Sequence, residues 1–239
     1  LNPDYRLASE AESLKLLQDN LFFLPLNYFR PLGNPTRFLD GLFHHFSRLK
    51  DEDVSPEEYL LWAKNLKAER KEKEKYQELA KVYQKYEEIK IKEGLMDFGD
   101  LITQVLTLFR KRPNVLRQYR QKFAHILIDE FQDTNIAQYQ LLKLLAPPKA
   151  NPDLTIVADD SQSVYKFRGA AVSNILQFKK DYPQAKMVSL IKNYRSYQEI
   201  LDASYRLIKH NDPDTLEAQL KISKNLKSQR GEGGEVEFW

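Results

Sequence analysis

The stretch HILIDEFQDTN, residues 125–135, runs three apolar residues (126–128) directly into the carboxylates Asp129 and Glu130. A short apolar run that ends in polar residues is typical of a buried strand in a parallel sheet. In such sheets, ligands bind beyond the carboxyl ends of the strands. The stretch therefore predicts a strand that delivers two carboxylates to a binding crevice. The residues alone also allow a second interpretation, in which the carboxylates only cap the helix that follows.

The half of the chain that follows Lys122 alternates strands with helices. We predict buried strands at 123–129, 154–159 and 185–190, and helices at 134–146, 171–182 and 196–210. Strands that alternate with helices form parallel sheets with right-handed crossovers. The sequence therefore predicts an α/β fold in which the three strands share one parallel sheet.

The first half of the chain is predominantly helical. Ser55 is a suitable N-cap, Pro56 suits the first turn, and no helix breaker follows until Gly94. This pattern predicts one long helix or a helical hairpin. Lys, Arg and Glu alternate along it, which indicates either a solvated face over an apolar stripe or a basic surface that faces DNA. Asp97 is a suitable cap for the next helix.

The composition excludes several classes of protein. The chain has 239 residues, which suits one large domain or two modest ones, and it has no cysteine, which excludes disulfides and thiolate zinc sites. Its apolar runs are far shorter than a membrane span and no secretory signal opens it, so we expect a cytoplasmic protein. A net charge of +3 permits nucleic-acid binding without arguing for it. The chain begins at Leu1 and stops at GGEVEFW, so we expect a segment of a longer protein.

Polar clusters follow all three predicted strands, and we expect them to line one crevice. At the first strand, Asp129 can hold Mg²⁺ and Glu130 can orient or deprotonate an attacking water. The second strand leads into VADDSQSVYKFRGA, residues 157–170, and the third into LIKNYRS, residues 190–196. A Mg²⁺ ligand next to a carboxylate that activates water is typical of a nucleotide-hydrolysing site.

Within these clusters, Gln162 is an uncharged donor suited to a γ-phosphate, and Arg195 is a fixed cation suited to the charge in phosphoryl transfer. Tyr165 and Phe167, with Arg168 beside them, are able to stack bases, which contributes about 1–3 kcal/mol per base. The alternatives are that these aromatics belong to the core and that Arg195 pairs with a nearby acid. We also expect one of the two aspartates in this stretch to cap its loop.

Three motifs, in this order and spacing, resemble those of the UvrD/Rep/PcrA-type DNA helicases of superfamily I: ILIDEFQDTN, VADDSQSVYKFRGA and NYRS. MDFGDL, residues 96–101, is similar to the point where that family's chain returns from an inserted helical subdomain. The resemblance implies a partial RecA-like parallel sheet flanked by helices. It divides the chain into a mainly helical inserted subdomain at 1–94, a RecA-like ATPase core segment at 95–200 and a connection toward the second motor domain at 201–239.

The family unwinds duplex DNA by translocating along one strand, so the resemblance implies ATP and Mg²⁺ as cofactors and single-stranded and duplex DNA as partners. It implies that Asp129 is a Mg²⁺ ligand and that Glu130 is the base that activates water. It also implies that Gln162 couples the γ-phosphate to DNA and that Arg195 contacts the γ-phosphate. Nucleotide-binding roles fall on Gln132, Asp133 and Tyr194, the last of which would pack near the adenine. DNA-binding roles fall on Tyr165, Phe167 and Arg168.

The sequence departs from the family's pattern at three positions. The family often has Gly where Ala158 stands, an acidic residue or Lys where Ser161 stands, and Trp where Phe167 stands. A larger departure is the missing phosphate-binding loop, since no Gly in the chain is followed by Lys. We expect that loop before Leu1 and the later motifs after Trp239. We therefore expect no appreciable ATP hydrolysis by this chain alone.

Two other functions fit parts of the sequence. The Lys-rich helices and the aromatic loop also suit a module that binds single-stranded DNA or a protein without hydrolysis. An unrelated phosphate-processing enzyme explains Asp129 and Glu130 but neither of the later motifs. Exposed strand edges also predict self-association of the segment, with the missing remainder of the chain as its natural partner.

Overall fold

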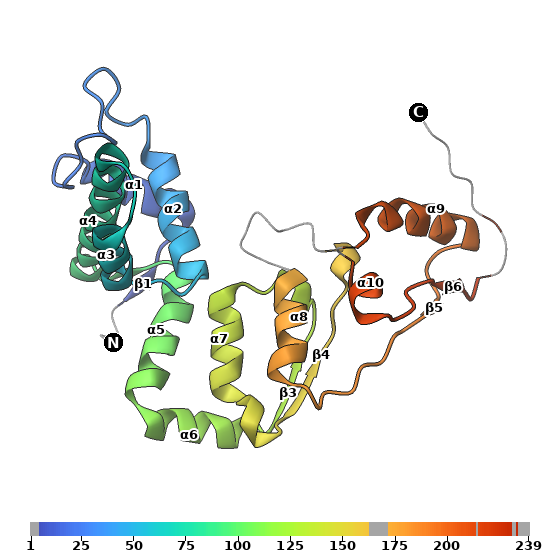
Figure 1. Cartoon of the computed structure of the whole chain (residues 1–239). Helices are drawn as coiled ribbons and strands as arrows, with labels where there is room; N and C mark the ends of the chain where they lie inside the picture. The colour runs from blue at the N-terminus through green and yellow to red at the C-terminus, as the bar shows by residue number, and fades with distance from the viewer. Residues whose placement is uncertain (1–4, 163–171, 214, 231–232, 234–239) are drawn as a thin grey trace. The chain divides into compact units, whose positions relative to one another are not determined.

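A computed structural model of the chain describes residues 5–162, 172–213, 215–230 and 233 (Figure 1). The chain forms two compact units. The first comprises the described residues up to 126 together with 134–154, and the second comprises 127–133, 155–162 and the described residues from 172 onward. The predicted DNA-binding residues Tyr165, Phe167 and Arg168 lie outside the described residues.

The first unit is built from helices: α1 (Glu10–Asp19), α2 (Leu39–Asp51), α3 (Pro56–Asn65), α4 (Arg70–Lys92), α5 (Phe98–Lys111), α6 (Pro113–Lys122) and α7 (Ile136–Leu145). Two short strands, β1 (Arg6–Leu7) and β2 (Leu95–Met96), pair in parallel, with Arg6 opposite Leu95. This pair brings together the two ends of the segment that carries α1 to α4. Within the residues that the structure describes, every helix is too short or too polar to span a lipid bilayer.

The helical segment predicted after Ser55 is a hairpin of α3 and α4 (Figure 1). Ser55 caps α3, because its Oγ accepts the N–H of Glu58 at 3.2 Å and the Glu58 carboxylate accepts the N–H of Ser55 at 2.9 Å. The backbone becomes extended at Leu66, although neither Pro nor Gly stands there. Folding back buries apolar residues of both helices, including Ala63 and Ala80, in one core. Packing of this kind outweighs the helix propensity of the connection.

Phe46 of α2 lies in the middle of this core. Its ring stacks with those of Tyr83 and Tyr86 on α4, at centroid distances of 5.1 Å and 5.8 Å. All three side chains are buried. Aromatic pairs of this kind contribute about 0.5–1.5 kcal/mol beyond the area that they bury. The stack therefore fixes α2 against α4.

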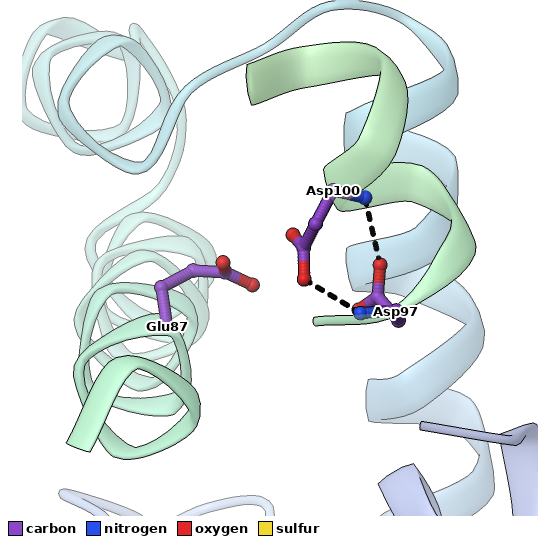
Figure 2. A group of neighbouring side chains, drawn as sticks. All are labelled: Glu87, Asp97 and Asp100. Atoms are coloured by element: carbon purple, nitrogen blue, oxygen red, sulfur yellow. Dashed lines mark hydrogen bonds between the residues drawn. The ribbon is translucent and has the colours of Figure 1, made fainter. Parts of the chain in front are cut away.

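Five charged side chains form a buried cluster where α2, α4 and the start of α5 meet: Lys50, Glu87, Lys90, Asp97 and Asp100. Figure 2 shows the three carboxylates and the two hydrogen bonds by which Asp97 caps α5, as predicted from its position. Nζ of Lys50 lies 2.5 Å from Asp97 and 2.7 Å from Asp100, and Nζ of Lys90 lies 2.8 Å and 2.6 Å from the same carboxylates. The two lysines are only 3% and 2% exposed.

The two lysines of this cluster offset most of the charge of its three carboxylates. Burial opposes the charge of Lys50, but the carboxylates of Glu87, Asp100 and Asp97 outweigh burial and raise the pKa of Lys50 well above its usual value. Burial likewise favours the neutral form of Asp97, yet the two lysines lower the pKa of Asp97. The carboxylates lie close enough together to hold a metal ion, but the two ammonium groups already bind them. We therefore interpret the cluster as a buried ion-pair network that joins three helices.

The second unit carries shorter elements. Strand β3 (His125–Ile128) pairs with β4 (Asp153–Ile156), and the carboxyl ends of both belong to this unit. Strand β5 (Lys192–Asn193) pairs in parallel with β6 (Lys227–Ser228). The helices are α8 (Val172–Asp181), α9 (Gln198–Ile208) and α10 (Leu216–Leu220). The chain is therefore α/β, mainly helical with short strand pairs.

Two predictions about the strands are wrong. Residues 185–190 do not form a strand, and β5 begins at Lys192 and pairs with β6, so the described chain contains no single sheet of three strands. In addition, β3 and β4 are not fully buried, since Leu127 of β3 is 78% exposed and Asp153 and Thr155 of β4 are also exposed. These exposed side chains show that packed layers do not cover both faces of the strand pair. A parallel strand is buried only when layers cover both of its faces.

Candidate functional site

Asp129 and Glu130 form a turn directly after β3. Glu130 has a φ of 50°, in the left-handed region that residues with side chains rarely adopt. Its N–H donates to Oδ1 of Asp129 at 2.9 Å. Both side chains are exposed. The turn therefore presents two carboxylates to solvent or to a ligand.

Phe131 anchors this turn. Its N–H donates to the carbonyl of Val157 at 2.9 Å, and the N–H of Val157 donates to the carbonyl of Ile128 at 2.8 Å. Its ring is buried, and the ring of Phe178 on α8 lies 5.7 Å away. The carboxylates are therefore held by strand hydrogen bonds and by a packed ring.

Gln132 connects the ends of β3 and β4 by hydrogen bonds. Its Nε2 donates to Oε2 of Glu130 at 2.5 Å, and its Oε1 accepts the N–H of Asp159 at 3.0 Å. The side chain is 0% exposed, so water does not compete for either bond. A buried amide that is satisfied at both ends is rigid. Gln132 therefore fixes the Glu130 carboxylate relative to the turn after β4.

Asp159 is the centre of the turn after β4. Its Oδ2 accepts a hydrogen bond from Nε2 of Gln162 at 3.0 Å, and its Oδ1 accepts the N–H of Ser161 at 3.1 Å. Burial alone would raise the pKa of Asp159, but hydrogen bonds from Lys224 and Gln162 outweigh burial and lower this pKa below its usual value. The aspartate predicted to cap the loop is thus Asp159, and it is ionised at neutral pH.

Lys224 contributes a cation to the same turn. Its Nζ donates to Oδ1 of Asp159 at 2.7 Å and to Oγ of Ser161 at 2.8 Å, and it also donates to Asp160. Burial favours the neutral form of Lys224, but hydrogen bonds to the two aspartates raise its pKa above the usual value. Sequence reasoning missed this residue, because it lies outside every recognised motif and no local pattern marks it.

Asp129 and Asp133 offer oxygen ligands for a divalent cation. Asp129 uses one carboxylate oxygen for the N–H of Glu130. Oδ1 of Asp133 is buried and has no hydrogen-bond partner among the described residues. Burying a carboxylate oxygen is unfavourable unless a cation or an ordered water binds it. Oxygen donors of this kind suit Mg²⁺, so the residues fit the predicted ion.

Tyr194 and Arg195 lie on a separate turn at the end of β5. Oδ1 of Asn193 accepts the N–H of Arg195 at 2.9 Å and the N–H of Ser196 at 2.8 Å, which fixes the turn. The side chains of Tyr194 and Arg195 are exposed. Both are therefore accessible to a ligand.

Three predicted site residues join one hydrogen-bonded network through Asp159: Glu130, Gln132 and Gln162. In the described part of the chain, this network makes no hydrogen bond or ion pair with Arg195 or Tyr194. These hydrogen bonds bring Glu130, Gln132 and Gln162 together, while Arg195 stands on a separate turn.

Comparison with known families defines the class of the protein. The family model described as the UvrD/REP helicase N-terminal domain matches residues 1–183, well over half of the chain. The chain therefore belongs to the UvrD/REP helicase N-terminal domain family.

Among individual proteins, the chain is similar to bacterial proteins named ATP-dependent DNA helicase PcrA. It is 38% identical over 194 residues to that of Leuconostoc citreum, which covers 81% of this chain and 24% of the relative. The Bacillus subtilis protein is 41% identical over 163 residues, which covers 68% and 21%. The Staphylococcus aureus protein is 47% identical over 135 residues, which covers 56% and 18%. The chain thus spans about a quarter or less of the length of these relatives.

Proposed function

We propose that this chain is a segment of an ATP-dependent DNA helicase that translocates on single-stranded DNA and unwinds duplex DNA. The observation that carries the proposal is the network from Glu130 through Gln132 and Asp159 to Gln162. Such a network links a carboxylate suited to activating water with an amide suited to sensing a phosphate, as nucleotide-driven motors require. Membership of the helicase family and the names of the relatives support the proposal.

In this proposal, ATP and Mg²⁺ are the cofactors. The Glu130 carboxylate accepts a proton from water as the water oxygen attacks the γ-phosphorus, and the bond from that phosphorus to the ADP oxygen breaks. Asp129 would hold Mg²⁺, and the buried Oδ1 of Asp133 is a second candidate ligand. The ion would supply positive charge that neutralises the phosphate oxygens. Gln162 donates a hydrogen bond to the γ-phosphate, and the Arg195 guanidinium stabilises its developing charge.

The proposal keeps the division into an inserted helical subdomain at 1–94, a RecA-like segment at 95–200 and a connection at 201–239. The parallel pairing of β1 with β2 supports the first boundary, since an inserted segment must leave its host close to where it entered. The exposed ring of Tyr194 supports its role against the adenine. A cytoplasmic location stays a prediction from the sequence.

Alone, this chain is expected to show no ATP turnover above the rate without protein. The physical reason is that triphosphates need the backbone N–H groups of a Gly-rich loop, and the sequence lacks such a loop. The measurement is phosphate release in the presence of Mg²⁺ and single-stranded DNA, with the Glu130→Gln variant as the matched control. Turnover that disappears in the variant would contradict the prediction.

The same chain is expected to bind single-stranded DNA through its aromatic loop. Replacing Tyr165 and Phe167 by Ala should weaken binding about tenfold for each lost stack, since a base–aromatic stack contributes about 1–3 kcal/mol. Fluorescence anisotropy of a labelled oligonucleotide at low salt measures this change. The control is Phe23→Ala, which removes an exposed phenylalanine of the first unit. Unchanged affinity in the double variant would exclude a stacking role for the loop.

A further inference from the structure

Residues 224–230 contact two separate turns of the second unit. One is the turn at 159–162, which carries Gln162, and the other is the turn at 193–196, which carries Arg195. The motifs recognised in the sequence include both turns but not this segment.

The first end of the segment holds the 159–162 turn. An ammonium group has three hydrogens to donate. Lys224 directs them to Asp159, Asp160 and Ser161, so its donors are matched by three successive residues of the turn. Gln162 donates to the same Asp159 carboxylate that Lys224 binds. A displacement of Lys224 would therefore change the position of the carboxylate to which the Gln162 amide donates.

The second end of the segment holds the 193–196 turn. The N–H of Gln229 donates to the carbonyl of Asn193 at 2.7 Å, in the ladder between β6 and β5. Oγ of Ser228 donates to the carbonyl of Ser196 at 2.8 Å, and Nη1 of Arg230 donates to the carbonyl of Arg195 at 3.0 Å. Three consecutive residues thus fix the backbone from which the Arg195 side chain projects.

The two ends are too close along the chain to move independently. Lys224 and Ser228 are four residues apart, so their Cα atoms are separated by roughly 14 Å at most. The stretch between them is also held, because the side chain of Gln198 donates to the carbonyl of Leu226 at 3.2 Å and accepts the N–H of Ser228 at 2.9 Å. We therefore expect a shift at one end to reach the other.

We propose that residues 224–230 are a positioning segment that couples the Gln162 turn to the Arg195 turn. The roles of Gln162 and Arg195 at the γ-phosphate rest on the function proposed above. The segment then ensures that the amide and the guanidinium change position together when nucleotide binds or is hydrolysed. Lys224, Ser228 and Arg230 act through these turns and do not themselves touch the nucleotide.

The test uses amide NMR spectra of the full, deuterated 239-residue chain with neither nucleotide nor DNA. Lys224→Met removes the contacts of the first end, and Ser228→Ala removes one hydroxyl at the second end. The matched control is Lys221→Met, because Lys221 is an exposed lysine three residues before Lys224. The unfolding midpoint of each variant is measured in parallel.

Coupling predicts effects at a distance in both directions. Lys224→Met should shift the amide resonances of Arg195 and Ser196, which it does not contact, by more than the Lys221→Met control does. Ser228→Ala should likewise shift the resonances of Ser161 and of the Gln162 side chain. If Lys224→Met unfolds the chain, the Ser228→Ala variant decides the question alone.

Shifts confined to the contacted turn in each variant would overturn the proposal and leave two independent anchors. Because the experiment contains neither ATP nor DNA, its outcome is independent of the helicase function. A failure of the proposed function appears instead in the DNA-binding assay. The two failures are therefore distinguishable.

Discussion

Replacing Glu130 by Gln in a helicase that contains this segment together with a phosphate-binding loop lowers kcat for ATP by about 10²–10⁴-fold, the range typical of a lost general base. The KM for ATP changes little, because Gln keeps the size of the side chain and an oxygen that accepts the hydrogen bond from Gln132. Steady-state phosphate release in the presence of single-stranded DNA measures both constants.

The matched control for this variant is Glu93→Gln, which neutralises an exposed glutamate at the end of α4 in the first unit. It is expected to leave both constants unchanged. A Glu130→Gln enzyme that retains kcat within a few-fold of the unmodified enzyme would remove Glu130 from the chemistry. The network through Gln132 would then be structural only.

Replacing Lys50 by Met destabilises the first unit by about 3–5 kcal/mol, the cost expected when one partner of a buried ion pair is removed. The variant leaves Lys90 alone with the three carboxylates of the buried cluster. The measurement is the free energy of unfolding from denaturant titration. The control is Lys92→Met, which removes an exposed lysine from the end of α4.

The pH dependence of this effect has a definite sign. In the unmodified chain the pKa of Lys50 is raised, so its contribution to stability is present at neutral pH and is lost only as the pH rises beyond the usual lysine value. In the variant, one ammonium group faces three carboxylates, so burial and their mutual repulsion favour proton uptake, and the penalty diminishes as the pH falls. The difference in unfolding free energy should therefore be smaller at pH 5 than at pH 7. A difference that does not change with pH would contradict the buried charge network.

Local patterns in the sequence predicted where helices begin. Ser55 and Asp97 each accept the N–H of the residue three positions later, as their residue types indicate. A cap depends on only a few neighbouring residues, so the sequence contains the information. The break at Leu66 has no such signal, because the packing of α3 on α4 sets it.

The strand prediction at 185–190 failed for a related reason. The apolar residues there favour a strand, but a strand forms only where another strand offers its backbone. In the described chain β6 offers its backbone to residues 192–193, two positions further along. Pairing partners of this kind lie far away in the sequence and leave no local mark.

The candidate site also contains residues that local sequence patterns indicate and residues that they do not. The carboxylates and Gln162 were candidates from the sequence because each stands within a few residues of a strand end, where ligands bind. Lys224 was not, since its partners Asp159, Asp160 and Ser161 lie 65, 64 and 63 residues earlier in the chain. Only the folded structure brings these groups together.

The left-handed conformation of Glu130 has an evolutionary consequence. Holding a residue with a side chain at such a φ costs roughly 1–2 kcal/mol, and glycine avoids most of that cost. A lineage of this chain freed from the need for the carboxylate would gain stability by drifting to Gly at this position. In the proposed function, the Glu130 carboxylate explains why a residue with a side chain stands at this φ.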